Sequence, residues 1–274
     1  MTYPQDTAAA TRHYFSSGDL TLSYLDFGGD GERVLLLLHG HMNDARVFTK
    51  FAGKIKGLGW RVLALDQRGH GWSGHSPEKD YSRASYVNDV LAFIRDVLGG
   101  QPVTLLGHSL GGLNAYQFAA RYPQYVNAVI VEDIGAEIQA DLSFVTQLPE
   151  RSPSLQALRE SLVRVGVRAV DYFSESVFED ERGWGFRSDL QGMLVSQQNC
   201  NGSWWEDWLA STCPILLIHG KKSFVMTESH AGQMVARRPN TQLAVFADCG
   251  HDVHTDDLEG YTQAVTGFLQ EMGK

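Results

Sequence analysis

Short, solid runs of apolar residues recur along the chain, and they constrain its fold more than any other feature of the sequence. Apolar runs of this length are typical of parallel strands that are buried on both faces of a sheet. Residues 21–27 instead alternate between apolar and polar side chains, as a strand does. The predicted strands lie at residues 21–27, 34–38, 61–65, 103–106, 128–131, 215–218 and 243–246.

Longer helical patterns separate these strands. Between residues 82 and 98, for example, Tyr86, Val90, Phe93 and Val97 recur on one helical face. The alternation of strands and helices predicts an α/β protein with a mostly parallel central sheet flanked by helices on both sides. The predicted helices lie at residues 45–56, 82–98, 110–121, 228–238 and 258–272.

Residues 134–212 break this alternation. The segment is helical in pattern, contains no convincing strand and is rich in aromatic side chains. We interpret it as a helical cap inserted over the carboxyl edge of the sheet, so that residues 1–133 and 213–274 form the core. Its tryptophans at 204, 205 and 208 have helical spacing, and they either pack inside the cap or line a substrate pocket.

The sharpest chemical signal is the sequence Gly-His-Ser-Leu-Gly at residues 107–111, which follows a predicted strand and opens a predicted helix. A G-x-S-x-G nucleophile elbow requires this context, because its serine occupies a strained strand-to-helix turn. The backbones of the strand and the helix cross at this turn, so the residues two before and two after the serine must be small, as Gly107 and Gly111 are. The following helix N-terminus favours a developing anion. Ser109 is therefore the predicted nucleophile.

With this elbow the chain resembles the α/β-hydrolase superfamily, over nearly its whole length outside the insertion. Residues 39–41 (His-Gly-His) look like the family's oxyanion loop. Residues 66–73 look like its D-x-R-G-x-G-x-S segment, and residues 250–252 (Gly-His-Asp) like its histidine loop. These motifs follow the family's order, and the insertion falls where the family places its cap. The resemblance implies a serine hydrolase with a helical cap.

The oxyanion of a tetrahedral intermediate needs hydrogen-bond donors aimed at it. The elbow supplies the backbone N–H of Leu110, and the resemblance implies the backbone N–H of His41 as the second donor. The His41 imidazole either contacts substrate or caps its own loop, and the sequence favours neither.

A serine nucleophile needs a base within hydrogen-bond reach. His251 follows the last predicted strand, at the sheet edge from which Ser109 also emerges, and the resemblance places the family's histidine directly after a glycine, as Gly250 is here. His254 lies on the same loop and is the rival candidate. We predict His251 as the base.

The third member of the triad is where this chain departs from the family. The family usually places an Asp or Glu three residues after the glycine that ends the next-to-last strand, and Ser223 occupies that position here. Some members place the acid after the strand that follows the elbow helix, which ends here in Glu132 and Asp133. We predict Asp133 as the acid, with Glu132 and Glu228 as alternatives. A Ser–His pair without an acid is also open.

Composition limits the classes of partner. The formal net charge of −9 argues against binding to nucleic acid or anionic lipid. No window approaches the length of apolar chain that a membrane helix needs, residues 1–12 lack the apolar run of a signal peptide, and three widely spaced cysteines fit a reducing compartment. We expect a cytoplasmic protein that acts on a small molecule, and homo-oligomerisation stays open.

Several histidines cluster in the predicted loops, at positions 39, 41, 70 and 75. No spacing of histidine and carboxylate resembles a helical metal site. We therefore expect polar loops that line the pocket, with neither a metal ion nor a cofactor.

The leading functional hypothesis is hydrolysis of a carboxylic ester or lactone through an acyl-enzyme. The aromatic cap suggests an apolar or ring-bearing substrate. Two alternatives stay open: a carbon–carbon bond hydrolase of aromatic-ring degradation, and a non-enzymatic ligand-binding member whose triad has decayed. Ser223 motivates the latter.

Overall fold

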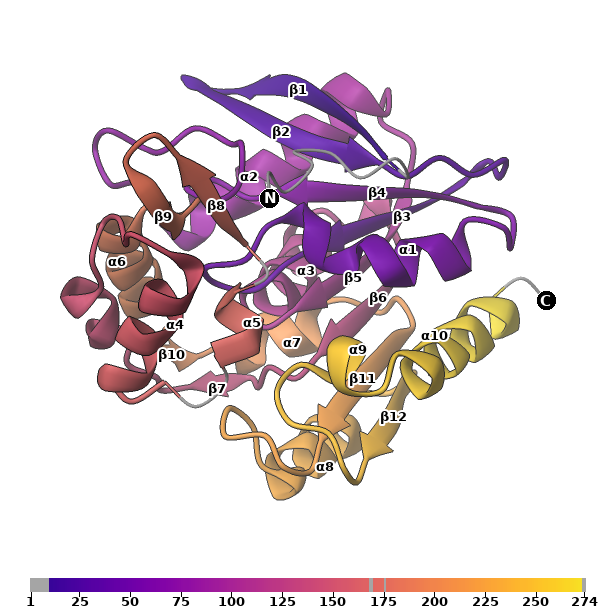
Figure 1. Ribbon diagram of the computed structural model, residues 1–274. Coiled ribbons are helices and arrows are strands. Elements are labelled where there is room, and N and C mark those ends of the chain that lie inside the picture. The colour runs from indigo at the N-terminus through magenta and orange to yellow at the C-terminus, as the bar shows by residue number, and fades with distance from the viewer. Residues whose placement is uncertain (1–9, 168–169, 175, 273–274) are drawn as a thin grey trace.

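An eight-stranded sheet runs through the protein in the order β1-β2-β4-β3-β5-β6-β11-β12 (Figure 1). The computed structural model describes residues 10–167, 170–174 and 176–272. Strand β2 is antiparallel to both of its neighbours, and every pair from β4 to β12 is parallel. The strands are β1 (Thr11–Ser17), β2 (Leu20–Asp26), β3 (Arg33–Leu38), β4 (Trp60–Asp66), β5 (Val103–His108), β6 (Val126–Glu132), β11 (Ile215–Gly220) and β12 (Thr241–Phe246).

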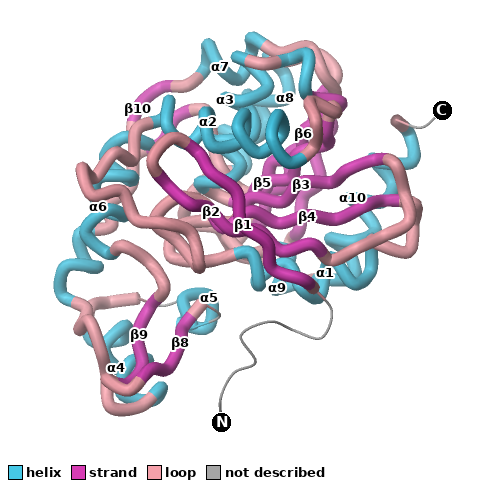
Figure 2. The backbone as a smooth tube through the Cα atoms, turned by 90° about the horizontal axis from the view of Figure 1, so that it is seen from above, coloured by secondary structure: helices cyan, strands magenta, loops and turns pink. Residues whose placement is uncertain are grey.

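Helices cover both faces of this sheet, which confirms the predicted α/β fold. Figure 2 shows α1, α9 and α10 on one side of the strands and α2, α3, α7 and α8 on the other. The core helices are α1 (Thr49–Ile55), α2 (Arg83–Ala92), α3 (Leu110–Arg121), α8 (Glu228–Arg237), α9 (Val253–Asp256) and α10 (Leu258–Glu271), with short 3₁₀ turns η1 (Ala45–Phe48) and η3 (Pro123–Tyr125) and a π turn η2 (Phe93–Val97).

The central strands read as solid apolar runs because each of them is buried on both faces. In β3, Leu36 and Leu38 belong to the hydrophobic cluster that contains α2 and α3, whereas Leu35 and Leu37 belong to the cluster that contains α1 and α10. All four side chains are fully buried. Alternating residues of one strand therefore supply two separate cores.

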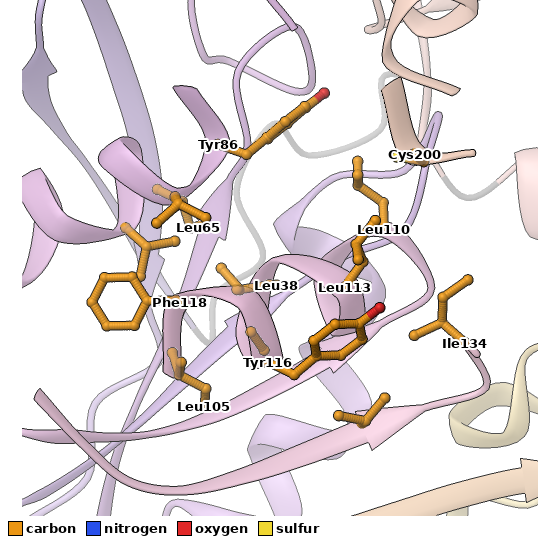
Figure 3. Packing of buried hydrophobic residues seen from close by; sticks show 14 of the residues in the cluster. Leu38, Leu65, Tyr86, Leu105, Leu110, Leu113, Tyr116, Phe118, Ile134 and Cys200 are labelled. Atoms are coloured by element: carbon orange, nitrogen blue, oxygen red, sulfur yellow. The ribbon is translucent and has the colours of Figure 1, made fainter. Parts of the chain in front are cut away.

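Helix α3 is the element that anchors the elbow to the core. Figure 3 shows Leu110, Leu113 and Tyr116 of this helix among the packed residues around Leu38 and Leu105. On its other side, Tyr116 of α3 contacts the Trp208 ring edge to face, with ring centroids 5.6 Å apart. A helix buried along most of its length gives the nucleophile a rigid support.

The insertion between β6 and β11 is not purely helical, which corrects the expectation that it contains no strand. Its strands have only two to four residues each, too few for their periodicity to be recognised in the sequence. Its elements are β7 (Glu137–Ile138), η4 (Ser143–Gln147), α4 (Leu155–Arg164), α5 (Val170–Ser174), β8 (Val177–Asp180), β9 (Gly183–Phe186), α6 (Leu190–Cys200), β10 (Gly202–Ser203) and α7 (Trp205–Ala210).

The last helix of the insertion packs on the core rather than inside the cap. Trp208 of α7 is fully buried, and its indole Nε1–H donates to the Met234 carbonyl of α8 at 3.0 Å. This tryptophan is a packing residue. Among residues 10–167, 170–174 and 176–272, no helix combines the length and apolar character that crossing a bilayer requires.

Strand register gathers the candidate site residues at one edge. His108 at the end of β5 pairs with Glu132 at the end of β6, and Glu132 in turn pairs with Ile218 near the end of β11. The residues that follow these strands, Ser109 and Asp133 among them, therefore leave the sheet side by side.

The elbow depends on two backbones crossing closely, which gives a test of the fold. A Cβ added at Gly107 would lie 2.1 Å from the Gly111 carbonyl oxygen. We expect Gly107→Ala to lower the free energy of unfolding by about 1–3 kcal/mol or more, as overpacking does. Gly53→Ala, at an exposed position of α1 with no atom within 4 Å of the added Cβ, should raise it by about 0.5–1 kcal/mol. Urea denaturation measures both, and a Gly107→Ala protein as stable as wild type would contradict the close crossing.

Candidate active site

The serine of the elbow is held in a strained backbone conformation. Ser109 has φ +53° and ψ −116° and lies directly before the first residue of α3. Such a conformation is sparsely populated and persists only where the surrounding structure imposes it. The side chain is partly accessible to solvent. Among the described residues its hydroxyl makes no hydrogen bond, a common state of a catalytic group before substrate binds.

The histidine loop lies against the elbow. The imidazoles of His108 and His251 have ring centroids 4.5 Å apart. In addition, His108 Nε2 lies 3.0 Å from the His251 carbonyl oxygen, so the residue next to the nucleophile fixes the backbone of the predicted base. Sequence reasoning did not assign His108 this contact.

Asp133 is the carboxylate that meets His251. Its Oδ2 lies 2.8 Å from His251 Nδ1, and its side chain is fully buried. Asp133 itself has φ +50°, a conformation uncommon outside glycine. The turn after β6 thus directs the carboxylate across β11 toward the histidine loop.

Three further donors hold the same carboxylate. His219 Nδ1 lies 3.0 Å from Asp133 Oδ1, and the backbone N–H of Gly220 donates to that oxygen at 3.3 Å. The Ser223 hydroxyl donates to Oδ2. The serine at the family's usual acid position therefore supports a carboxylate that reaches the histidine from another strand. Sequence analysis missed His219, although its place at the end of β11 was a usable signal.

The electrostatics of this pair favour a charged acid and a basic imidazole. Burial opposes ionisation of Asp133, but hydrogen bonds from His219 and His251 hold its pKa below the ordinary value. Burial also opposes protonation of His251, yet the hydrogen bond and charge of Asp133 raise its pKa above the ordinary 6.5. The environment therefore stabilises the imidazolium that a serine nucleophile would generate.

The other two candidate acids are placed elsewhere. Glu132 Oε1 accepts from the Nδ1–H of His254 at 2.8 Å and from its backbone N–H at 2.9 Å. Glu132 therefore faces the rival histidine and not His251, because neighbouring residues of a strand point to opposite faces. Glu228 lies on the surface of α8 and forms an exposed ion pair with Lys221 at 3.2 Å.

The backbone N–H groups of the two predicted oxyanion donors, His41 and Leu110, are not engaged in the loop and turn hydrogen bonds of the described residues. The N–H of Leu110 is the first of α3, and the first N–H groups of a helix have no partner within it. The loop of His41 lies close to the elbow, since a Cβ on Gly40 would lie 2.9 Å from His108 Nδ1.

The imidazole of His41 joins the oxyanion loop to the cap. Its Nε2 lies 2.8 Å from the hydroxyl of Ser196 on α6, and Tyr86 OH lies 2.9 Å from the same hydroxyl. Tyr172 of α5 donates to the His41 carbonyl oxygen at 3.1 Å. Burial, with Arg83 nearby, lowers the pKa of His41 to about 3, so the ring is neutral. The neutral ring presents no charge to substrate, and its hydrogen-bond partner is a cap residue and not its own loop.

Two aromatic side chains flank His251. The Tyr172 ring lies 6.3 Å from the His251 ring, and the Phe224 ring lies 5.6 Å from it, centroid to centroid. Phe224 is 80% exposed, which is unusual for a large apolar side chain. An apolar group bound beside His251 would cover it.

One buried cluster has the composition of a metal site. Nitrogen and carboxylate atoms of His108, Glu132 and His254 all lie within 4.8 Å of one another. One carboxylate oxygen of this cluster, Glu132 Oε1, already accepts a hydrogen bond from His254. The cluster lies beneath the histidine loop, where it supports the backbone of residues 251–254.

Comparisons with known proteins show which family and which proteins the chain is similar to. A sequence model described as the alpha/beta hydrolase family matches residues 35–264. The chain is 28% identical over 268 residues to the sn-1-specific diacylglycerol lipase of Mus musculus, covering 91% of this chain and 85% of the lipase. It is 25% identical over 290 residues to the 2-hydroxy-6-oxononadienedioate/2-hydroxy-6-oxononatrienedioate hydrolase of Klebsiella pneumoniae, covering 98% of this chain and 99% of that enzyme.

Among solved structures, the chain is similar to E-2-(acetamidomethylene)succinate hydrolase, with a TM-score of 0.82 and 23% identity over 95% of this chain and 99% of that one. At that identity the likeness shows the fold alone.

The buried Glu132–His254 pair can be tested by stability. His254→Ala leaves the Glu132 carboxylate buried without this partner, so we expect it to lower the free energy of unfolding by about 3–5 kcal/mol. Replacing both residues by leucine should cost much less, because it removes the uncompensated charge as well. Denaturation of Glu132→Leu, His254→Leu and the double leucine variant, alongside His254→Ala, measures the coupling. Additive effects would show that the two side chains do not act as a pair.

Proposed function

Because the chain belongs to the alpha/beta hydrolase family, we propose that it is a serine hydrolase that cleaves carboxylic esters or lactones through an acyl-enzyme. The observation that carries the proposal is the 2.8 Å contact between Asp133 Oδ2 and His251 Nδ1 at the edge of the sheet where Ser109 emerges. That contact supports Asp133 as the acid, a role that the serine at position 223 cannot fill. It weakens the case for a decayed, non-enzymatic member.

In the first half of the reaction, Ser109 Oγ attacks the carbonyl carbon while His251 Nε2 takes its proton. Asp133 holds the imidazole by its Nδ1–H and stabilises the imidazolium. The oxyanion accepts hydrogen bonds from the N–H groups of His41 and Leu110. His251 then returns the proton to the leaving alkoxide as the tetrahedral intermediate collapses.

In the second half, water attacks the acyl-enzyme with His251 again as the base, and Ser109 leaves with the returned proton. A lactone would follow the same course, with its alkoxide remaining attached to the acyl group. The aromatic rings of Tyr172 and Phe224 beside His251 favour a substrate with an apolar or ring-bearing group next to the scissile bond.

A carbon–carbon bond hydrolase is the second candidate. The 25% identity to the Klebsiella enzyme favours it, and such enzymes also carry the Ser and His pair. A panel that contains p-nitrophenyl esters, aryl lactones and a vinylogous β-diketone separates the two. Turnover of the diketone alone would replace ester hydrolysis as the proposed reaction.

The nucleophile assignment predicts the effect of Ser109→Ala. We expect loss of ester turnover by about 10⁶-fold in kcat, because nucleophile and base act as a unit. A fluorophosphonate should label wild type at Ser109 and leave the variant unlabelled. His251→Ala should lose nearly as much, whereas folded His254→Ala should retain most of its turnover. Labelling at another residue, or unchanged turnover by Ser109→Ala, would exclude this serine.

The acid assignment predicts a change in the pH profile. His251 acts in its neutral form and its pKa is raised, so wild-type activity should fall as the pH drops through a value above 6.5. Asp133→Asn removes the charge that raises this pKa. We expect kcat to fall by up to about 10⁴-fold and the acid limb of kcat/KM to move to lower pH.

Two controls sharpen this test. Ser223→Ala removes one donor to Asp133 and should have a far smaller effect, and adding Ser223→Asp to Asp133→Asn should restore part of the activity. Burial raises the pKa of Asp252 to about 7, so this group titrates in the same range, and Asp252→Asn should keep the acid limb. A profile that loses its acid limb in Asp252→Asn but not in Asp133→Asn would contradict the assignment.

A further inference from the structure

A cleft of about 590 Å³ lies between the cap and the loop that follows β4, and it belongs to no part of the proposed catalytic machinery. The β4 loop contributes Gly71 and His75, and the cap contributes η4, β8, β9 and the segment that leads into α6. The two sides are joined by the Gly71 N–H, which donates to the Arg187 carbonyl oxygen at 2.7 Å. The cleft therefore has a defined shape.

Arg187 is the distinctive group of this cleft. Its guanidinium carbon lies 4.1 Å from the Trp72 ring centroid and 4.4 Å from that of Phe178, so the cation is held between two aromatic faces. Within the described part of the chain, Arg187 forms no ion pair, and its Nε is buried without a hydrogen-bond partner. A half-buried guanidinium with no carboxylate beside it is an open position for an anion.

The acidic residues that act on Arg187 from a distance are already engaged. Asp44 and Asp66 are the carboxylates whose charge reaches it. Asp44 is paired with Arg46 at 2.8 Å, and Asp66 is paired with Arg12 at 2.5 Å. Both arginines also stack on Trp72, at 4.9 and 3.9 Å from the ring centroid. The two acids and the two arginines thus form closed pairs, and neither acid is left to pair with Arg187.

The other charged groups of the cleft form closed pairs. Arg182 is 3.0 Å from Glu150, and Asp189 is 2.5 Å from Lys79. Arg151, the remaining cation of the lining, is 2.8 Å from Asp180. Arg187 is left as the uncompensated charge of the cleft, in a protein whose formal net charge is −9.

The rest of the lining combines an apolar wall with a second open donor. Val145, Leu148 and Phe186 are buried apolar residues that line the cleft. Next to Arg187, the hydroxyl of Ser188 is buried and has no partner among the described residues. A ligand that fits this lining has a carboxylate at one end and an apolar body at the other.

We propose that this cleft is a second binding site, specific for a small monocarboxylate with an aromatic or aliphatic body, which Arg187 binds through its guanidinium fork. The site is separate from the catalytic centre and does not depend on hydrolysis. The acid released by the proposed reaction belongs to this chemical class, so the site suits feedback by a product-like acid.

Isothermal titration of benzoate and octanoate into the full-length protein tests the proposal. The protein is used untreated and after labelling with a fluorophosphonate, so that binding at the catalytic centre is counted separately. We expect both acids to bind in each case and to change the intrinsic tryptophan fluorescence, to which Trp72 contributes. Benzyl alcohol, octanol and inorganic phosphate should bind at least tenfold more weakly, since each lacks either the charge or the apolar body.

Variants locate the site. Arg187→Gln should weaken benzoate binding at least tenfold, and Arg182→Gln, which removes a paired arginine from the same lining, should change it less than threefold. Since Arg187→Gln also alters the packing of Trp72, Thr146→Trp at the exposed rim serves as a second variant that fills the cleft without changing a buried residue. Unchanged benzoate binding in both Arg187→Gln and Thr146→Trp, or phosphate and alcohols that bind as tightly as the acids, would overturn the proposal. The titrations of the variants require no turnover, so failure of the proposed hydrolysis, and of fluorophosphonate labelling with it, would leave the comparison of Arg187→Gln with Arg182→Gln interpretable.

Discussion

The active-site geometry depends on one buried carboxylate. Asp133 receives hydrogen bonds from His251, His219, Ser223 and the backbone of Gly220, so it ties the end of β6 to β11 and to the histidine loop. A buried carboxylate is tolerable only when its oxygens are satisfied in this way. Its donors are therefore as necessary to the site as the carboxylate itself. The positive φ of Asp133 is part of the same arrangement, because an ordinary strand continuation would carry the side chain past the histidine.

A second acid–histidine pair, Glu132 with His254, lies directly beneath the first. Neighbouring positions at the end of β6 thus serve two purposes: the Asp133 carboxylate holds the His251 imidazole, and the Glu132 carboxylate fixes the start of α9. His108 adds a third support through the His251 carbonyl oxygen. The base is held by its ring on one side and by its backbone on the other.

The sheet and the elbow could be predicted because both leave a strong local pattern. Buried parallel strands read as apolar runs, and the crossing at Gly107 and Gly111 demands small residues at fixed spacing. Strand β1 escaped notice because only two of its side chains, Phe15 and Ser17, are buried. The two- to four-residue strands of the insertion are too short for any period to emerge.

The surroundings of Asp133 were harder to foresee. Its nearness to His251 could be argued from strand order alone, but the backbone turn that aims it and the partnership with His219 depend on tertiary structure. Arg187 is the extreme case. Nothing in its local sequence distinguishes it from the paired arginines at 151 and 182, because its isolation follows from the pairing of the other charged residues that line the cleft.

The contact between His41 and Ser196 couples the oxyanion loop to the cap. The predicted oxyanion donor His41 makes two hydrogen bonds to the cap. Its imidazole contacts Ser196 of α6, and its carbonyl oxygen accepts from Tyr172 of α5. Any displacement of these cap helices must either break those bonds or drag the loop away from the elbow. In the proposed mechanism, the position of the His41 N–H therefore depends on where α5 and α6 lie, so the cap would control the oxyanion loop as well as cover the substrate.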